Sequence, residues 1–270
     1  MASSNTTPGS GISVTDHAGV MVVALDRPPA NALNRQLIRE FTALFTELAS
    51  RSTVPAVVVI GAGDRFFTAG GDIKELDGVQ HSEISGRMTD FQALLVGLDR
   101  YPAPVVAAIN GHCVGGGLEI ALFADSVLSV AGGRFGFPEI NHGLLPADKG
   151  IQRAVRIVGT RATRGLLLSG ELIDAEQAQQ IGLVSTIVEP DALLDTAISA
   201  ARSAGDKAPV LYAALKRSVN DPDDEQDERS LRRTLAAAAE YFDDPTARAL
   251  REGWRSARTG LGRTVDVGAR

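Results

Sequence analysis

The residues best placed for chemistry lie in the stretch 104–125, PVVAAINGHCVGGGLEIALFAD, where an apolar run leads into a glycine triplet. A single acidic residue, Glu119, follows the triplet. Glycines at a strand-to-helix turn let a ligand approach the backbone, and the first amides of a helix have no partner within the helix. The carboxylate beyond them indicates either acid–base chemistry or a side chain that complements the helix dipole in a tight turn.

A second glycine loop follows an earlier strand. The segment 66–76 reads FFTAGGDIKEL, in which a glycine pair precedes Asp72. Two such loops on adjacent strands can point two backbone N–H groups at one oxygen, which is the geometry of an oxyanion hole. Asp72 can cap a helix that begins there, and Arg65 and Lys74 place a cation on either side. Neither loop has the spacing of a phosphate-binding or dinucleotide-binding motif.

Strands and helices alternate around these loops. Short runs rich in β-branched residues predict strands, at 12–16, 20–26, 54–60, 104–109, 126–130 and 183–188. Apolar residues at helical spacing predict one helix from about Asn34 to Ala49 and another around Met88–Leu98. The mixture predicts an α/β fold with one main sheet system.

The predicted secondary structure changes after about residue 190. From there on, apolar residues at helical spacing predict helices, and no segment predicts a strand. The acidic stretch Asp221–Glu228 is expected to be a solvated loop or a helix start, and Asp244-Pro245 is typical of an N-cap followed by proline. We therefore divide the chain into a disordered lead-in at 1–11, a core at 12–190 and a helical region at 191–270. That last region can complete the core or meet another subunit.

Composition narrows the class of protein. The 270 residues are 44% hydrophobic and 22% charged, which is typical of a globular protein, and the net charge of −6 argues against non-specific nucleic-acid binding. The single cysteine, Cys113, excludes an internal disulfide and a cysteine-rich metal cluster. No apolar segment has the length of a membrane span, and the first dozen residues lack the apolar core of a signal peptide. We expect a cytoplasmic protein.

Five segments together carry a resemblance to a known family. They are PANALN at 29–34, the glycine loops at 66–76 and 104–125, FGFPEI at 135–140, and the spaced Gly and Ala pattern that ends in Gly-Leu-Val at 170–184. In this order and with these gaps, the chain resembles the enoyl-CoA hydratase/isomerase (crotonase) superfamily over nearly its whole length.

The resemblance implies a fold, a substrate class and an assembly. The fold is the crotonase (ClpP-like) spiral of strand–strand–helix units with a helical C-terminal region. Members bind acyl thioesters of coenzyme A, need no metal or redox cofactor, and assemble as trimers or as hexamers made of two trimers. Backbone N–H groups at the positions of Gly71 and Gly116 would form the oxyanion hole for the thioester oxygen.

The resemblance also implies acid–base and binding residues. Enoyl-CoA hydratases use two glutamates to hold and activate one water, and Glu119 and Glu139 match both positions; isomerase relatives typically keep one. Contacts with the acyl group and coenzyme A are expected at Arg65, Ala69, Gly70, Asp72, Ile73, Lys74 and Ala147. Of these, Arg65 and Lys74 match cations near the nucleotide, or are simply solvated surface charges.

The chain departs from the hydratase pattern in two segments. Where hydratases commonly read ILLGxxPGAGGTQR, residues 140–153 read INHGLLPADKGIQR, so Ala147 replaces a glycine. The next two residues, Asp148 and Lys149, are expected to form a surface ion pair, with altered acyl specificity as the alternative. The C-terminal segment keeps the family's Glu-Gly pair but lacks the Phe that reaches the substrate site in relatives. His112 and His142 are expected to be structural or to line the pocket, since no Ser or Cys nucleophile accompanies them.

The retained glutamate pair favours an enoyl-CoA hydratase that adds water to a trans-2-enoyl-CoA and gives a 3-hydroxyacyl-CoA, as in fatty acid β-oxidation. Two alternatives stay open. One is another crotonase reaction, such as enoyl-CoA isomerisation or the hydration or hydrolysis of a cyclic acyl-CoA. The other is an acyl-CoA-binding protein that has lost catalytic activity. The altered segment 147–149 is the feature that supports this alternative.

Overall fold

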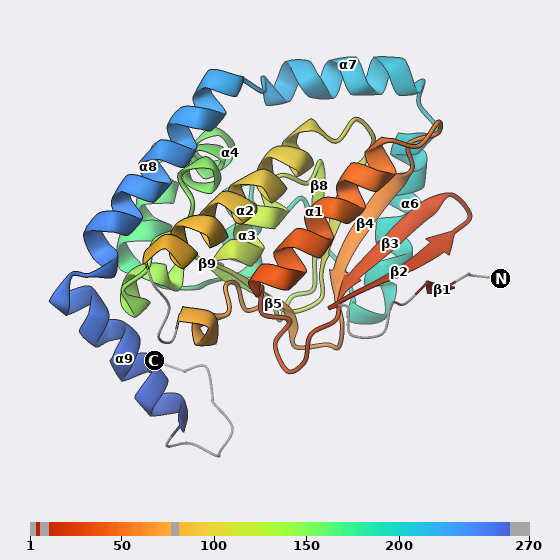
Figure 1. The fold of residues 1–270 in the computed structure, drawn as a ribbon. Coiled ribbons are helices and arrows are strands. Elements are labelled where there is room, and N and C mark those ends of the chain that lie inside the picture. Colours follow the sequence, from red (N-terminus) through yellow and green to blue (C-terminus); the bar gives the residue numbers. More distant parts are fainter. Residues whose placement is uncertain (1–3, 6–10, 77–80, 260–270) are drawn as a thin grey trace.

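The computed structural model describes residues 4–5, 11–76 and 81–259 of the chain, and within them the strands form two sheets (Figure 1). The larger sheet has, in order, β1 (Ser4–Asn5), β2 (Ile12–His17), β3 (Val20–Leu25), β4 (Ala56–Gly61), β6 (Val105–Ile109), β8 (Ser126–Ser129) and β11 (Thr186–Ile187). The smaller sheet has β10 (Ile173–Asp174), β9 (Arg134–Gly136), β7 (His112–Val114) and β5 (Phe66–Thr68). From β3 to β11 the larger sheet is parallel.

Helices connect and cover these strands. The α-helices are α1 (Arg35–Ala49), α2 (His81–Arg100), α3 (Gly116–Ala121), α4 (Asp148–Ser169), α5 (Ala175–Gln180), α6 (Leu193–Gly205), α7 (Pro209–Asn220), α8 (Asp224–Phe242) and α9 (Pro245–Thr259). Short 3-10 turns form η1 (Ile73–Leu76), η2 (Pro138–His142) and η3 (Pro190–Ala192). No described helix combines the length and apolar character that crossing a bilayer requires.

The chain winds as a spiral of repeated units. Each unit gives one strand to the larger sheet, the next to the smaller sheet, and then a helix: β4, β5 and α2, then β6, β7 and α3, then β8, β9 and α4. The smaller sheet therefore places the ends of β5, β7 and β9 side by side, and a loop or helix start follows each of them. The predicted crotonase fold is confirmed, and its three parallel turns bring distant glycine loops together.

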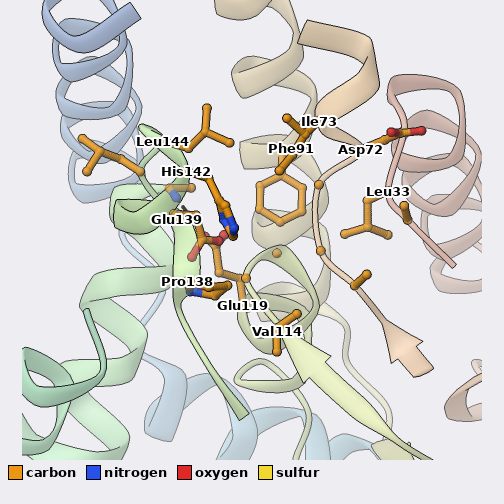
Figure 2. Close-up of a pocket in the computed structure, with 18 of the residues that line it drawn as sticks. Leu33, Asp72, Ile73, Phe91, Val114, Glu119, Pro138, Glu139, His142 and Leu144 are labelled. Atoms are coloured by element: carbon orange, nitrogen blue, oxygen red, sulfur yellow. Dashed lines mark hydrogen bonds between the residues drawn. The ribbon is translucent and has the colours of Figure 1, made fainter. Parts of the chain in front are cut away.

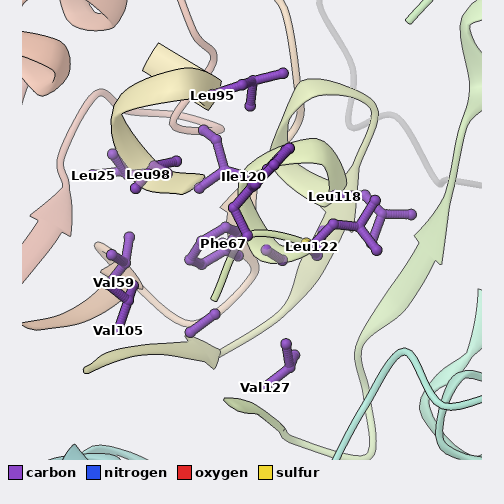
Figure 3. Packing of buried hydrophobic residues seen from close by; sticks show 14 of the residues in the cluster. Leu25, Val59, Phe67, Leu95, Leu98, Val105, Leu118, Ile120, Leu122 and Val127 are labelled. Carbon is purple, nitrogen blue, oxygen red and sulfur yellow. The ribbon is translucent and has the colours of Figure 1, made fainter. Parts of the chain in front are cut away.

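Alternating side chains bury both faces of the larger sheet. On β4, Val57 and Val59 face one core while Val58 faces a second one, as the two-residue period of a strand requires. The first core fills the space between the larger sheet, the smaller sheet and helices α1 to α3, and it includes Phe67, Leu118, Ile120, Val59 and Val105 (Figure 3). The second core lies under α6.

Local hydrogen bonds explain where the predicted elements begin and end. The side chain of Asn34 accepts a hydrogen bond from the Leu37 amide at 2.9 Å and starts α1, as the sequence predicts. Asp223 caps α8 and Asp244 caps α9 in the same way. The predicted strand 183–188 is shorter, with only 186–187 paired, because the amides of residues 183 and 184 bond to the Ala178 carbonyl at the end of α5.

The chain termini add two details. Within the lead-in expected to be disordered, residues 4–5 pair with β2, whereas 1–3 and 6–10 lie outside the described residues. At the other end, α6 packs on the larger sheet, α8 lies along α2 and α4, and α9 contacts η2 (Figure 1). Helices α8 and α9 thus reach back to the end of the spiral where the glycine loops lie.

Candidate active site

A cavity of about 430 Å³ lies where the three turns of the spiral meet the C-terminal helices. Its walls come from Ala30, Ala32 and Leu33, the glycine loops after β5 and β7, helix α2, turn η2, the end of α8, and α9. Most of the lining is apolar, and two carboxyl groups, those of Glu119 and Glu139, face into it (Figure 2). Such a concave apolar site with a few convergent polar groups is typical of a binding or catalytic site.

The two glycine loops pack directly against each other. Gly70 has a φ of +79°, and a Cβ on it would lie 2.8 Å from the Val114 carbonyl oxygen and 3.3 Å from the Gly116 nitrogen. Leu33 bridges the first loop, donating to the Gly70 carbonyl at 2.8 Å and accepting from the Asp72 amide at 3.0 Å. Any side chain at Gly70 would therefore separate the loops.

The bridge to Leu33 also orients the Gly71 amide. Because the Asp72 amide points toward Leu33, the preceding amide of Gly71 points to the opposite side of the extended backbone. Gly116 is the first residue of α3, where an N–H group has no acceptor within the helix. Both glycines line the cavity. The structure thus brings together the two positions at which the sequence predicts oxyanion donors.

Glu119 is held from two sides. It lies on α3 with 2% of its surface exposed, and its Oε1 accepts a hydrogen bond from the Ala147 amide at 3.0 Å. A Cβ on Gly150, in the first turn of α4, would lie 2.3 Å from the same oxygen. Burial raises the pKa of Glu119 well above its usual value and the nearby Glu139 raises it further, while the Ala147 amide and Arg87 act in the opposite direction.

Glu139 comes from the 3-10 turn η2, after Pro138. Its carboxyl group lies against Gly115, since a Cβ there would meet Oε1 at 2.4 Å, and Gly115 has a φ of +55°. Its Oε2 is buried and has no hydrogen-bond partner among the described residues. Burial raises the pKa of Glu139 to about 7. The pair therefore keeps a proton near neutral pH, which suits one proton donor and one acceptor.

Five of the remaining predicted residues line the cavity, namely Ala69, Gly70, Asp72, Ile73 and Ala147. Asp72 also has a structural role, because it pairs with Arg27 at 2.7 Å and accepts from the Lys74 amide at 3.1 Å at the start of η1, as predicted.

The predicted cations Arg65 and Lys74 lie outside this cavity. Both side chains are exposed, next to lining residues: Arg65 stacks over the ring of Phe66 at 5.2 Å, and Lys74 follows Ile73 on η1. Their contact with the nucleotide of coenzyme A stays a prediction.

The predicted surface ion pair between Asp148 and Lys149 is wrong. Lys149 is buried and pairs with Asp99 at 2.8 Å and Asp227 at 2.6 Å. Asp148 instead accepts a hydrogen bond from Ser230 at 2.9 Å. Both residues therefore fix α8 against the start of α4, and neither is part of the cavity wall. Asp227, from the acidic stretch at the start of α8, is far from Lys149 in the sequence. A pattern of neighbouring residues therefore could not predict this ion pair.

The two histidines line the cavity, in agreement with the prediction. Burial lowers the pKa of His112, with Arg65 acting in the same direction, and its Nδ1 has no hydrogen-bond partner among the described residues. His142 points toward the two carboxyl groups in Figure 2 and packs edge-on against Trp254 at 5.5 Å. Cys113 is buried, and burial raises the pKa of its thiol. Within the described part of the chain, no cluster of His, Cys, Asp and Glu could hold a metal ion.

Sequence reasoning missed several lining residues. Arg87 lies on α2 among the apolar positions Ile84, Met88 and Phe91, and a charge on an apolar helix face was the signal that could have found it. Tyr241, Phe242 and Trp254 close the cavity from α8 and α9. Trp254 thus provides an aromatic wall from a segment that lacks the family's Phe.

Comparison with known proteins agrees with this geometry. The family model described as enoyl-CoA hydratase/isomerase matches residues 15–257. A probable enoyl-CoA hydratase, EchA17 of Mycobacterium tuberculosis, is 38% identical over 76% of this chain and 78% of its own length. The short-chain-enoyl-CoA hydratase of Clostridium acetobutylicum is 37% identical over 74% of this chain and 77% of its own.

A solved structure of EchA1_1 from Mycobacterium paratuberculosis superposes with a TM-score of 0.78 at 30% identity, covering 93% of this chain and 96% of that one. The chain belongs to the enoyl-CoA hydratase/isomerase family, within the crotonase superfamily.

Proposed function

We propose that the protein is an enoyl-CoA hydratase that adds water across the double bond of a trans-2-enoyl-CoA and releases a 3-hydroxyacyl-CoA. The observation that carries the proposal is the carboxyl pair of Glu119 and Glu139, buried in one cavity beside the amides of Gly71 and Gly116. The relatives named as enoyl-CoA hydratases support it.

In this proposal the two amides bind the thioester oxygen. As water attacks C3, negative charge develops on that oxygen, and each backbone donor in a sheltered site stabilises it by roughly 3 kcal/mol. The N-terminus of α3 at Gly116 adds a favourable dipole. Backbone donors keep this function independent of the side chains around them.

The carboxyl pair balances the protons of the reaction. One carboxylate accepts a proton from water while the hydroxide oxygen bonds to C3, and the other carboxyl group donates its proton to C2. The pair holds one proton before and after the step, so neither metal nor redox cofactor takes part in this mechanism. The raised pKa values of both groups fit this shared proton near neutral pH.

Residues in and beside the cavity wall would bind the remaining parts of the substrate. Ala69, Gly70 and Ile73 would contact the thioester region of the acyl-CoA, and Arg65 and Lys74 would attract its phosphates from the exposed side. The place in fatty acid β-oxidation and the cytoplasmic location stay predictions from the sequence.

The decisive experiment follows the loss of enoyl absorbance of crotonyl-CoA and longer enoyl-CoAs with the parent, Glu119→Gln and Glu139→Gln. We expect hydration by the parent and a loss of at least about 100-fold in kcat for each variant, the scale of general acid–base catalysis. A parent that binds enoyl-CoA without turnover would identify a binding protein, and migration of a 3-enoyl double bond without hydration would identify an isomerase. Full activity of either variant would remove that glutamate from the mechanism.

We also propose that the protein self-associates through α7. One face of this helix is anchored to the body, where Lys216 donates to the Ala103 carbonyl and pairs with Asp125, and Asn220 donates to the Asp99 carbonyl. The other face exposes large apolar side chains, namely Val210, Leu211, Leu215 and Val219, each at least 63% exposed. A contiguous apolar face of this kind is typical of a protein–protein interface.

Sedimentation of the parent and of a Leu211→Glu/Leu215→Glu double variant tests this proposal. We expect a trimer or hexamer for the parent and smaller species for the variant. Leu168→Glu, at an exposed leucine on α4, is the matched control and should leave the assembly intact. A monomeric parent, or an unchanged double variant, would contradict an interface on α7.

A further inference from the structure

Arg87 is an unusual residue for an acyl pocket. It projects from α2 into the cavity wall with 12% of its side chain exposed. One Nη donates to the Leu33 carbonyl at 2.8 Å, while Nε is buried and has no hydrogen-bond partner among the described residues. The nearest carboxylate, Glu75, lies 3.6 Å from Nε and already accepts from the Arg35 amide. The guanidinium is thus only partly compensated.

The other charged groups around Arg87 leave this charge available. Asp72 is engaged by Arg27 at 2.7 Å. Glu119 is held by the Ala147 amide, which donates to its Oε1 at 3.0 Å. Tyr241, on α8, also lines the cavity. The cavity wall therefore carries a hydroxyl as well as a guanidinium.

A fully hydrocarbon acyl chain would suit this wall poorly. Closing such a chain over the cavity removes the remaining water from a guanidinium without replacing its hydrogen bonds, which is unfavourable. A carboxylate offers the planar, two-oxygen partner that guanidinium binds best. The tyrosine hydroxyl can donate a further hydrogen bond to the same group.

We propose that Arg87, assisted by Tyr241, selects acyl groups that end in a carboxylate, so that the preferred substrates are coenzyme A monothioesters of short unsaturated dicarboxylic acids. This deepens the proposed hydratase function and rests on it. The site favours short acyl groups, of about four to six carbons. The reason is position: the guanidinium lies beside Gly71, whose Cβ would meet Nη2 at 2.9 Å, close to the expected thioester oxygen.

The test compares matched substrates of equal length. Hex-2-enoyl-CoA and pent-2-enoyl-CoA are each paired with the monothioester that carries a terminal carboxylate, and with its neutral methyl ester. The measured quantity is the ratio of kcat/KM for the carboxylate to that for the methyl-terminated partner in the same protein. We expect at least about tenfold preference for the carboxylate in one pair, the scale of a hydrogen bond to a charged group. Equal turnover of the ester would overturn the proposal.

Variants assign the preference to Arg87. Arg87→Met should lower the ratio by about 10- to 100-fold, and Arg87→Lys should lower it less. Glu75→Gln, which weakens the competing ion pair, should raise the ratio, and it decides the question if Arg87→Met fails to fold. Tyr241→Phe should lower the ratio by a smaller factor. An unchanged ratio in Arg87→Lys and Glu75→Gln would refute the role of Arg87.

The outcomes separate this inference from the function on which it rests. If methyl-terminated enoyl-CoAs are hydrated and the carboxylates are not preferred, the hydratase function stands and the proposed selectivity fails. If no member of either pair is hydrated, the hydratase function itself fails.

Discussion

Gly150→Ala is the substitution that most directly tests how the site holds Glu119. Gly150 lies in the first turn of α4 with ordinary helical geometry, so alanine meets no backbone restriction there. Its Cβ, however, would lie 2.3 Å from Oε1, 2.6 Å from Cγ and 2.8 Å from Cδ of Glu119, where contact normally begins at 3.4 Å. The carboxyl group would have to withdraw by about 1 Å, since the overlap involves the side-chain stem as well as its end.

The expected effects on activity and stability differ. A misplacement of about 1 Å in a catalytic group can lower kcat/KM by about 100-fold, which corresponds to about 3 kcal/mol in the activation free energy. Alanine gains about 1 kcal/mol of helix propensity over glycine, which offsets part of an overpacking cost of about 1–3 kcal/mol. We therefore expect a folded protein that binds acyl-CoA and hydrates crotonyl-CoA poorly.

The control is Gly165→Ala in the part of α4 that follows the kink at Gly159, where a new Cβ has nothing within 4 Å. It should keep the parent activity and gain up to about 1 kcal/mol of stability. Both variants are assayed by the loss of enoyl absorbance and by urea unfolding. If Gly150→Ala keeps kcat/KM within about threefold of the parent while folded, the placement of Glu119 against α4 is not required for turnover.

Two further predictions concern stability. Because burial raises the pKa of Glu139 from 4.5 to about 7, the folded chain binds this proton more tightly than the unfolded chain, and stability falls as pH rises through that window. Between pH 5 and pH 8, urea unfolding should show a loss of stability that is larger in the parent than in Glu139→Gln by up to about 3 kcal/mol. The variant keeps a loss of its own, because burial also raises the pKa of Glu119. The same loss in parent and variant would contradict the prediction. Lys149→Met should cost up to about 3 kcal/mol by leaving Asp99 and Asp227 short of a cation, whereas the exposed Arg232→Ala should cost less than about 0.5 kcal/mol.

The sequence was most informative where one short segment contains all the residues that form a local structure. The glycine loops at 66–76 and 104–125 each combine a strand end, a turn and a helix or 3-10 start, and the structure places their glycines in contact. Glu119 and Glu139 could be assigned to one site because their segments follow adjacent turns of the spiral. Resemblance to a family supplied that adjacency, which no local pattern contains.

The sequence was least informative where tertiary packing joins distant segments. Helix α2 brings Arg87 to the cavity, and helices α8 and α9 bring Tyr241 and Trp254 from more than 150 residues further along the chain. Apolar periodicity predicted α2 and α8, and the Asp244-Pro245 pair predicted the start of α9. Neither signal showed which neighbour each helix would contact. The burial of Lys149 was missed for the same reason, since both of its carboxylate partners lie on other helices.

Two glycines of the site are required for different physical reasons, which the sequence motifs do not distinguish. Gly115 has a positive φ and also abuts Glu139, so its requirement is both conformational and steric. Gly150 has ordinary helical geometry and abuts Glu119, so its requirement is steric alone. The two residues are identical in the sequence, yet each leaves room for a different carboxyl group. The site thus holds both glutamates close to the backbone, in a buried setting that raises their pKa values, and it is this placement that makes a shared proton available for hydration.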